Sequence, residues 1–325
     1  MNEPTPNLIR RIGLFDSGVG GLSILKYLEE QAAASGIPVK FVYIADTARC
    51  PYGDRSEQEI TRYVEQIVSF LDSSGVDRVV MACNTSAAVA ASRAQEVSSA
   101  PVHDLITPSA RYVAARYKRV GVIATSTTCK KQAFSRAIKN LNADCEVIEI
   151  PCPDLVPLVE SGQLAGPVVD ATIAKYVDQL KEFNVDALIF GCTHFPFLND
   201  AFEKALPGVQ LINPAEHLST LLLGVREEKE RIPRAVDFQK SVYFTTGSAE
   251  SFANAAELCL KLQAGTLSES ICAMGVDQLE RVEMFDTNAP IPAPAIKEQR
   301  TQTHTVLLDN VLAPGQAPQG TAPTT

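Results

Sequence analysis

Short apolar runs alternate with longer amphipathic stretches along the first part of the chain. The apolar runs at 12–15, 41–45 and 78–82 are rich in β-branched residues and end at turn residues, which predicts buried strands. The stretches at 22–34 and 56–75 have the periodicity of helices. Strands that alternate with helices indicate a parallel sheet covered by helices on both faces.

The start of the second helical stretch carries a local signal. Ser56 stands immediately before it, and Glu59 follows three residues later. This spacing is typical of a capping box, in which the two side chains satisfy free N–H groups of the first turn. It predicts a helix that begins after Ser56.

The same alternation recurs further along the chain. Strands are expected at 119–125, 145–150 and 187–190, with a helix at 168–183. Cys192 follows Cys83 by 109 positions, the pair 185–186 repeats the Val-Asp of 76–77 at the same offset, and Gly121 follows Gly13 by 108. A duplicated α/β unit explains these constant offsets better than the general self-similarity that every α/β domain has from its repeated strands and helices.

The predicted fold class is α/β, with two pseudo-symmetric three-layer domains, largely parallel sheets and an active site in the cleft between them. Beyond 212 the elements continue as helix, strand, helix and strand at 214–229, 241–246, 249–263 and 281–285. They complete the first sheet in this interpretation. The expected domains are 11–105 plus 213–286, then 106–212, followed by a Pro-, Ala- and Thr-rich tail at 287–325 that cannot bury enough apolar surface to fold alone.

Composition narrows the classes of function. The chain has 325 residues, 46% of them hydrophobic, a mean hydropathy of +0.02 and a formal net charge of −9. The charge argues against an extended surface for nucleic acid or for an anionic membrane. The N-terminus has no secretion signal and no apolar run is long enough for a membrane span, so a cytoplasmic location is expected. Eight cysteines without a CxxC pair and only four histidines argue against a metal site.

Two cysteines occupy equivalent places in the repeat. Cys83 and Cys192 each follow an apolar strand and precede a predicted helix start. Ligands of open α/β sheets gather at this edge, and a helix N-terminus favours thiolate over thiol. On opposite walls of a cleft, one sulfur can remove a proton from a carbon while the other delivers one to the opposite face. Because a thiol titrates near pH 8.5, both forms are accessible to such acid–base chemistry.

Buried cysteine is more often a small hydrophobic residue than a functional one. We apply that interpretation to Cys129, Cys145, Cys259 and Cys272, and leave Cys50 and Cys152 undecided. For Cys83 and Cys192 the hydroxyl and amide residues that follow each sulfur favour function.

Several motifs in order resemble those of glutamate racemase, a member of the aspartate/glutamate racemase superfamily. They are IGLFDSGVGGLSIL (12–25), YIADTARCPYGDRS (43–56), MACNTSAA (81–88), GVIATSTT (121–128), CPDLVPLVESG (152–162), GCTHFPFL (191–198) and YFTTGSAESF (243–252). The resemblance implies a cofactor-independent isomerase that makes D-glutamate for peptidoglycan. It implies a small-molecule partner, L- or D-glutamate, and a homodimer as in many relatives.

The resemblance also implies roles for individual residues. Cys83 and Cys192 would be the two acid–base residues, and the amino acid would be bound by Asp16, Ser17, Tyr52, Gly53, Asn84, Thr85, Thr193 and His194. Supporting catalytic roles would fall to Asp16, His194, Asp46 and Glu160. Hydroxyl, amide and backbone N–H groups suit the two substrate carboxylates, and Asp16 suits the ammonium group.

Each assignment has a competing interpretation. Asp16 would otherwise only cap the following helix, and Asp46 and Glu160 would be structural ion-pair partners. The run Gly18–Gly21 matches no phosphate-loop pattern and is expected to let a ligand approach the backbone. Among whole functions, the rivals are a racemase for aspartate or a related amino acid, and a thiol redox protein in which the two cysteines form a disulfide.

Overall fold

Two parallel sheets organise the protein. The computed structural model describes residues 11–225 and 238–280. The six-stranded sheet has the order β10 (Ile271–Ala273), β9 (Val242–Thr245), β2 (Lys40–Ala45), β1 (Arg11–Asp16), β3 (Arg78–Met81) and β4 (Val102–His103). The four-stranded sheet has the order β6 (Glu146–Pro151), β5 (Arg119–Ala124), β7 (Ala187–Gly191) and β8 (Gln210–Ile212). Every paired strand runs parallel to its neighbour.

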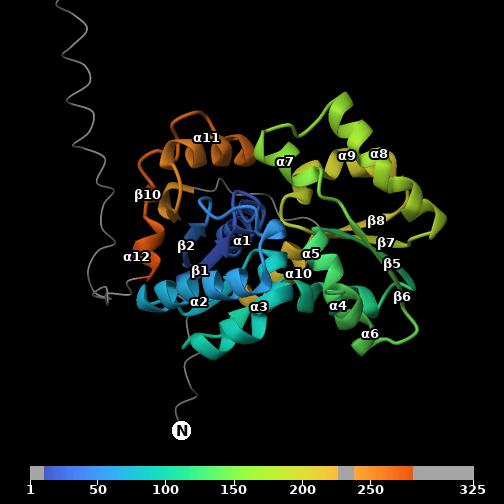
Figure 1. Cartoon of the computed structure of the whole chain (residues 1–325), viewed down its shortest axis with the longest axis horizontal. Coiled ribbons are helices and arrows are strands. Elements are labelled where there is room, and N and C mark those ends of the chain that lie inside the picture. Colours follow the sequence, from blue (N-terminus) through green and yellow to red (C-terminus); the bar gives the residue numbers. More distant parts are fainter. Residues whose placement is uncertain (1–10, 226–237, 281–325) are drawn as a thin grey trace, which may run out of the picture. The chain divides into compact units, whose positions relative to one another are not determined.

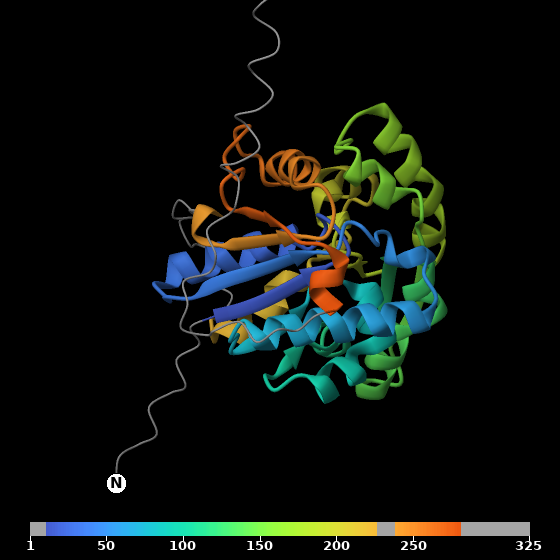
Figure 2. The same ribbon diagram turned by 60° about the vertical axis from the view of Figure 1, so that its left-hand side comes forward.

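Helices cover both faces of each sheet, which gives two three-layer α/β units (Figures 1 and 2). On one face of the larger sheet lie α1 (Leu22–Ser35) and α11 (Ala249–Leu260), and on the other lie α2 (Glu57–Ser73), α3 (Asn84–Val97) and α12 (Val276–Glu280). Helix α10 (Pro214–Leu223) packs against α1 and against β7 of the smaller sheet. Against the smaller sheet pack α7 (Leu155–Glu160), α8 (Pro167–Glu182) and α9 (Asn199–Ala205) on one face, and α4 (Ile106–Ala114), α5 (Ser126–Lys130) and α6 (Ala133–Leu141) on the other.

Strand alternation divides the core between the two faces. In β1 the side chains of Ile12 and Leu14 join the core that contains α1, whereas Phe15 joins the core that contains α2. Successive side chains of a strand point to opposite faces, so an almost entirely apolar strand fills two cores at once. This explains why the buried strands read as continuous apolar runs in the sequence.

Most of the expected elements are confirmed. The predicted capping box is present, since Ser56 Oγ accepts a hydrogen bond from Glu59 N–H and Glu59 Oε2 accepts one from Ser56 N–H at 2.9 Å. The strand expected at 241–246 is β9 and joins the larger sheet through β2. The expected strand at 281–285 and the tail at 287–325 lie outside the described residues, and the domain boundaries stay a prediction.

The two sheets repeat the same construction. The order β2-β1-β3-β4 in one corresponds to β6-β5-β7-β8 in the other. At the start of the central strand, Arg11 N–H donates to Asp77 Oδ2 at 2.8 Å, and Arg119 N–H donates to Asp186 Oδ2 at 2.9 Å. These matching contacts recur at the offset of the sequence repeat, which supports a duplicated unit.

A glycine occupies the same packing position in both central strands. A Cβ on Gly13 would lie 2.8 Å from a methyl carbon of Leu71, and one on Gly121 would lie 2.7 Å from the equivalent methyl of Leu180. Real Cβ atoms do not approach other carbons this closely, so each helix leucine packs directly on bare backbone.

We therefore expect Gly13→Ala and Gly121→Ala to destabilise the fold by similar amounts, about 1–3 kcal/mol each, because the added methyl overpacks the core. Urea unfolding followed by circular dichroism measures the change. Gly53→Ala is the matched control, since its Cβ would have no neighbour closer than 3.7 Å. An unfolding midpoint in either core variant equal to that of the control would contradict the packing argument.

Candidate active site

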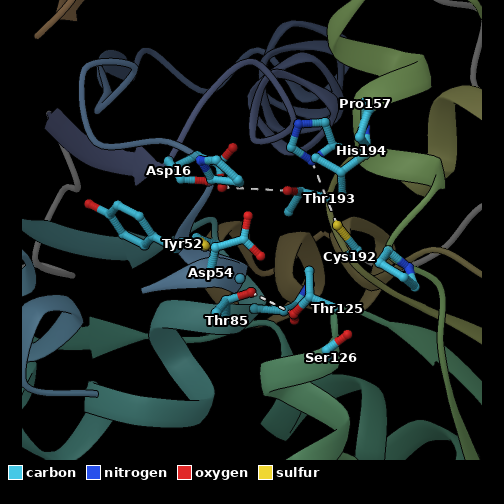
Figure 3. Close-up of a pocket in the computed structure, with 17 residues that line it drawn as sticks. Asp16, Tyr52, Asp54, Thr85, Thr125, Ser126, Pro157, Cys192, Thr193 and His194 are labelled. Atoms are coloured by element: carbon cyan, nitrogen blue, oxygen red, sulfur yellow. Dashed lines mark hydrogen bonds between the residues drawn. The ribbon is translucent and has the colours of Figure 1, made fainter. Parts of the chain in front are cut away.

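A cavity of about 190 Å³ lies at the carboxyl ends of the central strands of both sheets (Figure 3). Asp16 ends β1, Cys83 follows β3, Thr125 follows β5 and Cys192 follows β7, and all four line it. The remaining lining residues are Ser17, Pro51, Tyr52, Gly53, Asp54, Asn84, Thr85, Ser126, Pro153, Val156, Pro157, Thr193 and His194. Both halves of the duplicated fold thus contribute to one cavity.

Direct hydrogen bonds join the two halves around the cavity. Ser23 Oγ donates to the carbonyl oxygen of Thr193 at 2.9 Å, and the hydroxyls of Thr85 and Thr125 lie 2.9 Å apart. Buried polar groups are costly unless they are paired. These contacts therefore fix the relative position of the cavity walls.

Cys83 lies at the cap position before α3, with an extended backbone. Its side chain is buried, and its carbonyl oxygen accepts a hydrogen bond from Ser86 Oγ at 2.8 Å. Burial, followed by the negative charge of Asp16, raises the pKa of Cys83 to about 12. This environment favours the neutral thiol.

Cys192 has a different neighbour. Its Sγ lies 3.6 Å from Nδ1 of His194, and Nε2 of the same imidazole lies 2.6 Å from Oε1 of Glu160. Burial by itself lowers the pKa of His194, but the hydrogen bonds and charges of Cys192 and Glu160 outweigh it and hold the pKa well above its ordinary value. An imidazolium in this position donates to both neighbours.

Glu160 connects this group to the other half of the fold. Its Oε1 also accepts a hydrogen bond from the N–H of Val19, at 3.4 Å. Burial raises the pKa of Glu160, but the hydrogen bond and charge of His194 outweigh it, so the pKa is lowered. Glu160 is outside the cavity lining and contacts the site through His194.

The glycine run 18–21 provides room for these side chains. A Cβ on Gly20 would lie 2.5 Å from Cε1 of His194 and 2.6 Å from Oγ1 of Thr193. A Cβ on Gly18 would lie 2.5 Å from Oε1 of Glu160. The sequence predicted that the run admits a ligand; in the structure, side chains of the other half occupy the space beside these two glycines.

Asp16 lines the cavity and also holds the turn that precedes α1. Its Oδ2 accepts the N–H groups of Gly18 and Gly21, at 3.3 and 2.9 Å, and Thr193 Oγ1 lies 3.5 Å from Oδ1. Burial raises the pKa of Asp16, while the charge of His194 and the two backbone N–H groups oppose the rise. The backbone contacts expected of a capping residue are therefore present, and the functional role of Asp16 stays a prediction.

Asp46 lies behind the cavity wall, and its side chain is buried. Its carboxylate accepts two hydrogen bonds from Arg49 Nε, one from Thr246 Oγ1 at 2.8 Å and one from the hydroxyl of Tyr52. Tyr52 itself lines the cavity. Asp46 is thus an ion-pair partner of Arg49 that also fixes the Tyr52 ring.

Asn84 is a buried polar side chain in the lining whose hydrogen-bonding capacity stays open. Its side chain is buried, and neither Oδ1 nor Nδ2 has a partner within the described part of the chain. An unpaired buried amide is unfavourable. A ligand in the cavity would supply the missing partners.

Several lining residues are missing from the sequence prediction. Thr125 and Ser126 follow β5 at the equivalent edge of the second sheet, and their position after an apolar strand was a usable signal. Asp54 adjoins the predicted pair Tyr52-Gly53. The apolar lining of Pro51, Pro153, Val156 and Pro157 carried no signal, because no polar group marks it.

The other cysteines lie outside the lining. Cys129, Cys145, Cys152, Cys259, Cys272 and Cys50 are free thiols. In the described residues no group of three or more His, Cys, Asp and Glu side chains is arranged to hold a metal ion. A search of the same residues finds no helix that is long and apolar enough to span a membrane.

The fold and the polar cavity indicate an enzyme, and the relatives of the chain identify its class. The sequence profile of the Asp/Glu/Hydantoin racemase family matches residues 12–221. A glutamate racemase from Gloeobacter violaceus is 39% identical over 246 residues, which cover 75% of this chain and 90% of that protein.

Solved structures agree. The glutamate racemase of Francisella tularensis in complex with D-glutamate superposes with a TM-score of 0.70 at 30% identity, over 83% of this chain and 98% of that one. A glutamate racemase isoform from Bacillus anthracis gives 0.71 at 32% identity, over 82% and 98%. The chain belongs to the Asp/Glu/Hydantoin racemase family, and it is an isomerase.

The contact between Glu160 and His194 predicts a change in thiol reactivity. We expect Glu160→Gln to lower the pKa of His194, because it removes the carboxylate charge that stabilises the imidazolium. Loss of that positive charge weakens the electrostatic stabilisation of the attacking sulfur, so alkylation of Cys192 by iodoacetamide at pH 7 should slow about tenfold. Peptide mass spectrometry measures the rate.

Asp154→Asn is the matched control, because Asp154 precedes the same helix but pairs with Lys175 at 3.0 Å, away from His194. Its alkylation rate should equal that of the unmodified protein. Equal rates in both variants would show that Glu160 does not hold the imidazolium.

Proposed function

We propose that this protein interconverts L- and D-glutamate without a cofactor, with Cys83 and Cys192 as the two acid–base residues. The observation that carries the proposal is that sulfurs from corresponding strands of two duplicated sheets line one cavity of about 190 Å³. The relatives named glutamate racemase, at 39% identity over most of their length, favour glutamate as the substrate.

The proposed reaction moves one proton off the α-carbon and another onto it. A thiolate on one side removes the α-proton, the bond electrons remain on carbon, and the thiol on the other side delivers its proton to the opposite face. The stereocentre inverts, and the two sulfurs exchange protonation states. Acid–base residues on both sides are required because a single group would return its proton to the face from which it came.

The two sulfurs have different surroundings. Burial, followed by the charge of Asp16, favours the thiol of Cys83, whereas the imidazole of His194 lies beside Cys192. For one enantiomer we assign Cys192 as the base and Cys83 as the acid, and the roles exchange for the other.

The binding roles follow from the available donors and acceptors. We assign the substrate carboxylates to hydroxyl, amide and backbone N–H groups at Ser17, Tyr52, Gly53, Asn84, Thr85, Thr193 and His194, and the ammonium group to Asp16. Asp46 and Glu160 act as positioning residues, through Tyr52 and His194 respectively. The open hydrogen-bonding groups of Asn84 support this assignment.

The wider setting is proposed on the same basis. D-glutamate made here would supply peptidoglycan synthesis in the cytoplasm. We further propose that segments 11–105 and 213–286 form one domain and 106–212 the other, because strands from these segments form separate sheets, and that the protein is a homodimer.

The two-sulfur mechanism predicts the behaviour of serine variants. Cys83→Ser and Cys192→Ser should each lower kcat for racemisation by about 10²–10⁴-fold, because a serine hydroxyl is a far weaker acid–base group at neutral pH. Circular dichroism of glutamate measures the rate, with no cofactor added, and calorimetry should find glutamate binding nearly unchanged.

Cys272→Ser is the control, since Cys272 lies in β10 and outside the cavity lining. It should racemise at the rate of the unmodified enzyme. A single active-site variant that keeps its activity would refute the two-sulfur mechanism, and loss of a crosslink between the two cysteines would favour the redox alternative.

Racemisation in D₂O tests the proton path. The product enantiomer should carry one solvent deuterium at the α-carbon, because the delivering thiol exchanges with solvent. Nuclear magnetic resonance measures the incorporation.

The rate with aspartate tests the substrate. Aspartate, shorter by one methylene, should react about 10- to 200-fold more slowly than glutamate. Faster turnover of aspartate would instead identify an aspartate racemase.

A further inference from the structure

The charge of the cavity lining is unusual for a site that takes an acidic ligand. Within the described ranges, the lining includes two carboxylates, Asp16 and Asp54, one imidazole, His194, and no lysine or arginine. An anionic amino acid therefore enters a cavity whose own fixed charges are largely negative.

The two carboxylates differ in how their charge is balanced. Asp16 accepts backbone N–H groups from Gly18 and Gly21 and lies within the field of His194. Asp54 lies in the short 3₁₀ turn η1 (Tyr52–Asp54), and its carboxylate is directed into the cavity in Figure 3. Across 11–225 and 238–280, no hydrogen bond or ion pair engages that carboxylate.

Asp54 is exposed, so solvent screens part of its charge, but a carboxylate without a counter-charge from the described residues still distinguishes ligands by net charge. Glutamate carries two carboxylates and one ammonium group, whereas glutarate, with the same carbon chain, lacks the ammonium group and is a full dianion. With an effective dielectric constant of about 40 and a separation of about 6 Å, one additional charge changes a binding constant about tenfold. Asp16, which is proposed to bind the ammonium group, also favours glutamate, and Asp54 adds to that preference by its charge. The donors proposed for the substrate carboxylates do not discriminate, because both compounds have both carboxylates.

We propose that Asp54 is a specificity-determining residue whose carboxylate makes the cavity select dicarboxylates that carry an ammonium group over those that lack one. The proposal rests on the proposed function, since it concerns the ligand of the same site. Asp54 takes no part in the proton transfer; it disfavours the wrong ligand by charge.

The test compares the inhibition constant of glutarate with the KM of L-glutamate in the full chain. Asp54→Asn removes the charge and keeps the shape, so the ratio of the two constants should fall about tenfold. The matched control is Asp144→Asn, the same change at an exposed turn remote from the cavity lining. Its ratio should stay within about twofold of the unmodified enzyme.

Ionic strength gives a second measurement, which can be made on the unmodified enzyme alone. Raising the salt concentration from about 0.02 to about 0.5 M shortens the screening length, so the ratio of the two constants in the unmodified enzyme should fall. Where Asp54→Asn folds, its ratio should respond less to salt. A ratio in Asp54→Asn within twofold of the unmodified enzyme overturns the proposal. If Asp54→Asn does not fold, a salt-independent ratio in the unmodified enzyme overturns it.

The design separates this proposal from the function on which it rests. If the unmodified enzyme does not racemise glutamate, the proposed function fails. Calorimetric binding of glutamate and glutarate to the unmodified protein and to Asp54→Asn then still tests the charge selection. If glutamate is racemised and the ratio does not change, only the role of Asp54 is refuted.

Discussion

Two parallel sheets present the carboxyl ends of their central strands to one small cavity, and neither half completes the site alone. The chain of contacts from Cys192 through His194 and Glu160 ends on the backbone of Val19, in the other half of the duplicated fold. Cys192 and His194 are buried and Glu160 is half-buried, so each depends on the next for a partner. The position of one half therefore controls the electrostatics of a sulfur held by the other.

The duplication supplies a symmetric scaffold, and a few substitutions make its chemistry asymmetric. Thr85 and His194 occupy equivalent places, two residues after their cysteines. One half has a hydroxyl where the other has an imidazole, and the charge of Asp16 raises the pKa of Cys83. Two sulfurs with similar backbone positions thereby acquire opposite electrostatic neighbours. The proposed reaction uses this difference, with one sulfur assigned as the acid and the other as the base.

Close approach of backbone and side chains explains the glycines better than ligand access does. The leucines beside Gly13 and Gly121 recur at the repeat offset, whereas Gly20 accommodates an imidazole that only the second half carries. Gly13 and Gly121 therefore belong to the scaffold that both halves share. Gly20 belongs to the site, where the halves differ.

The sequence by itself determined the local elements, the duplication and the two cysteines, because strand and helix periodicity, caps and repeat offsets are encoded between near neighbours or at one constant spacing. The capping box at Ser56 and the strand ends at Cys83 and Cys192 are of this kind. Tertiary structure alone decided that Glu160 contacts His194, that Asp46 binds Thr246, 200 positions away, and that Asp54 faces the cavity. Such contacts depend on the order of strands within a sheet and on how helices and loops pack at its edge, and no local pattern of residues records that arrangement.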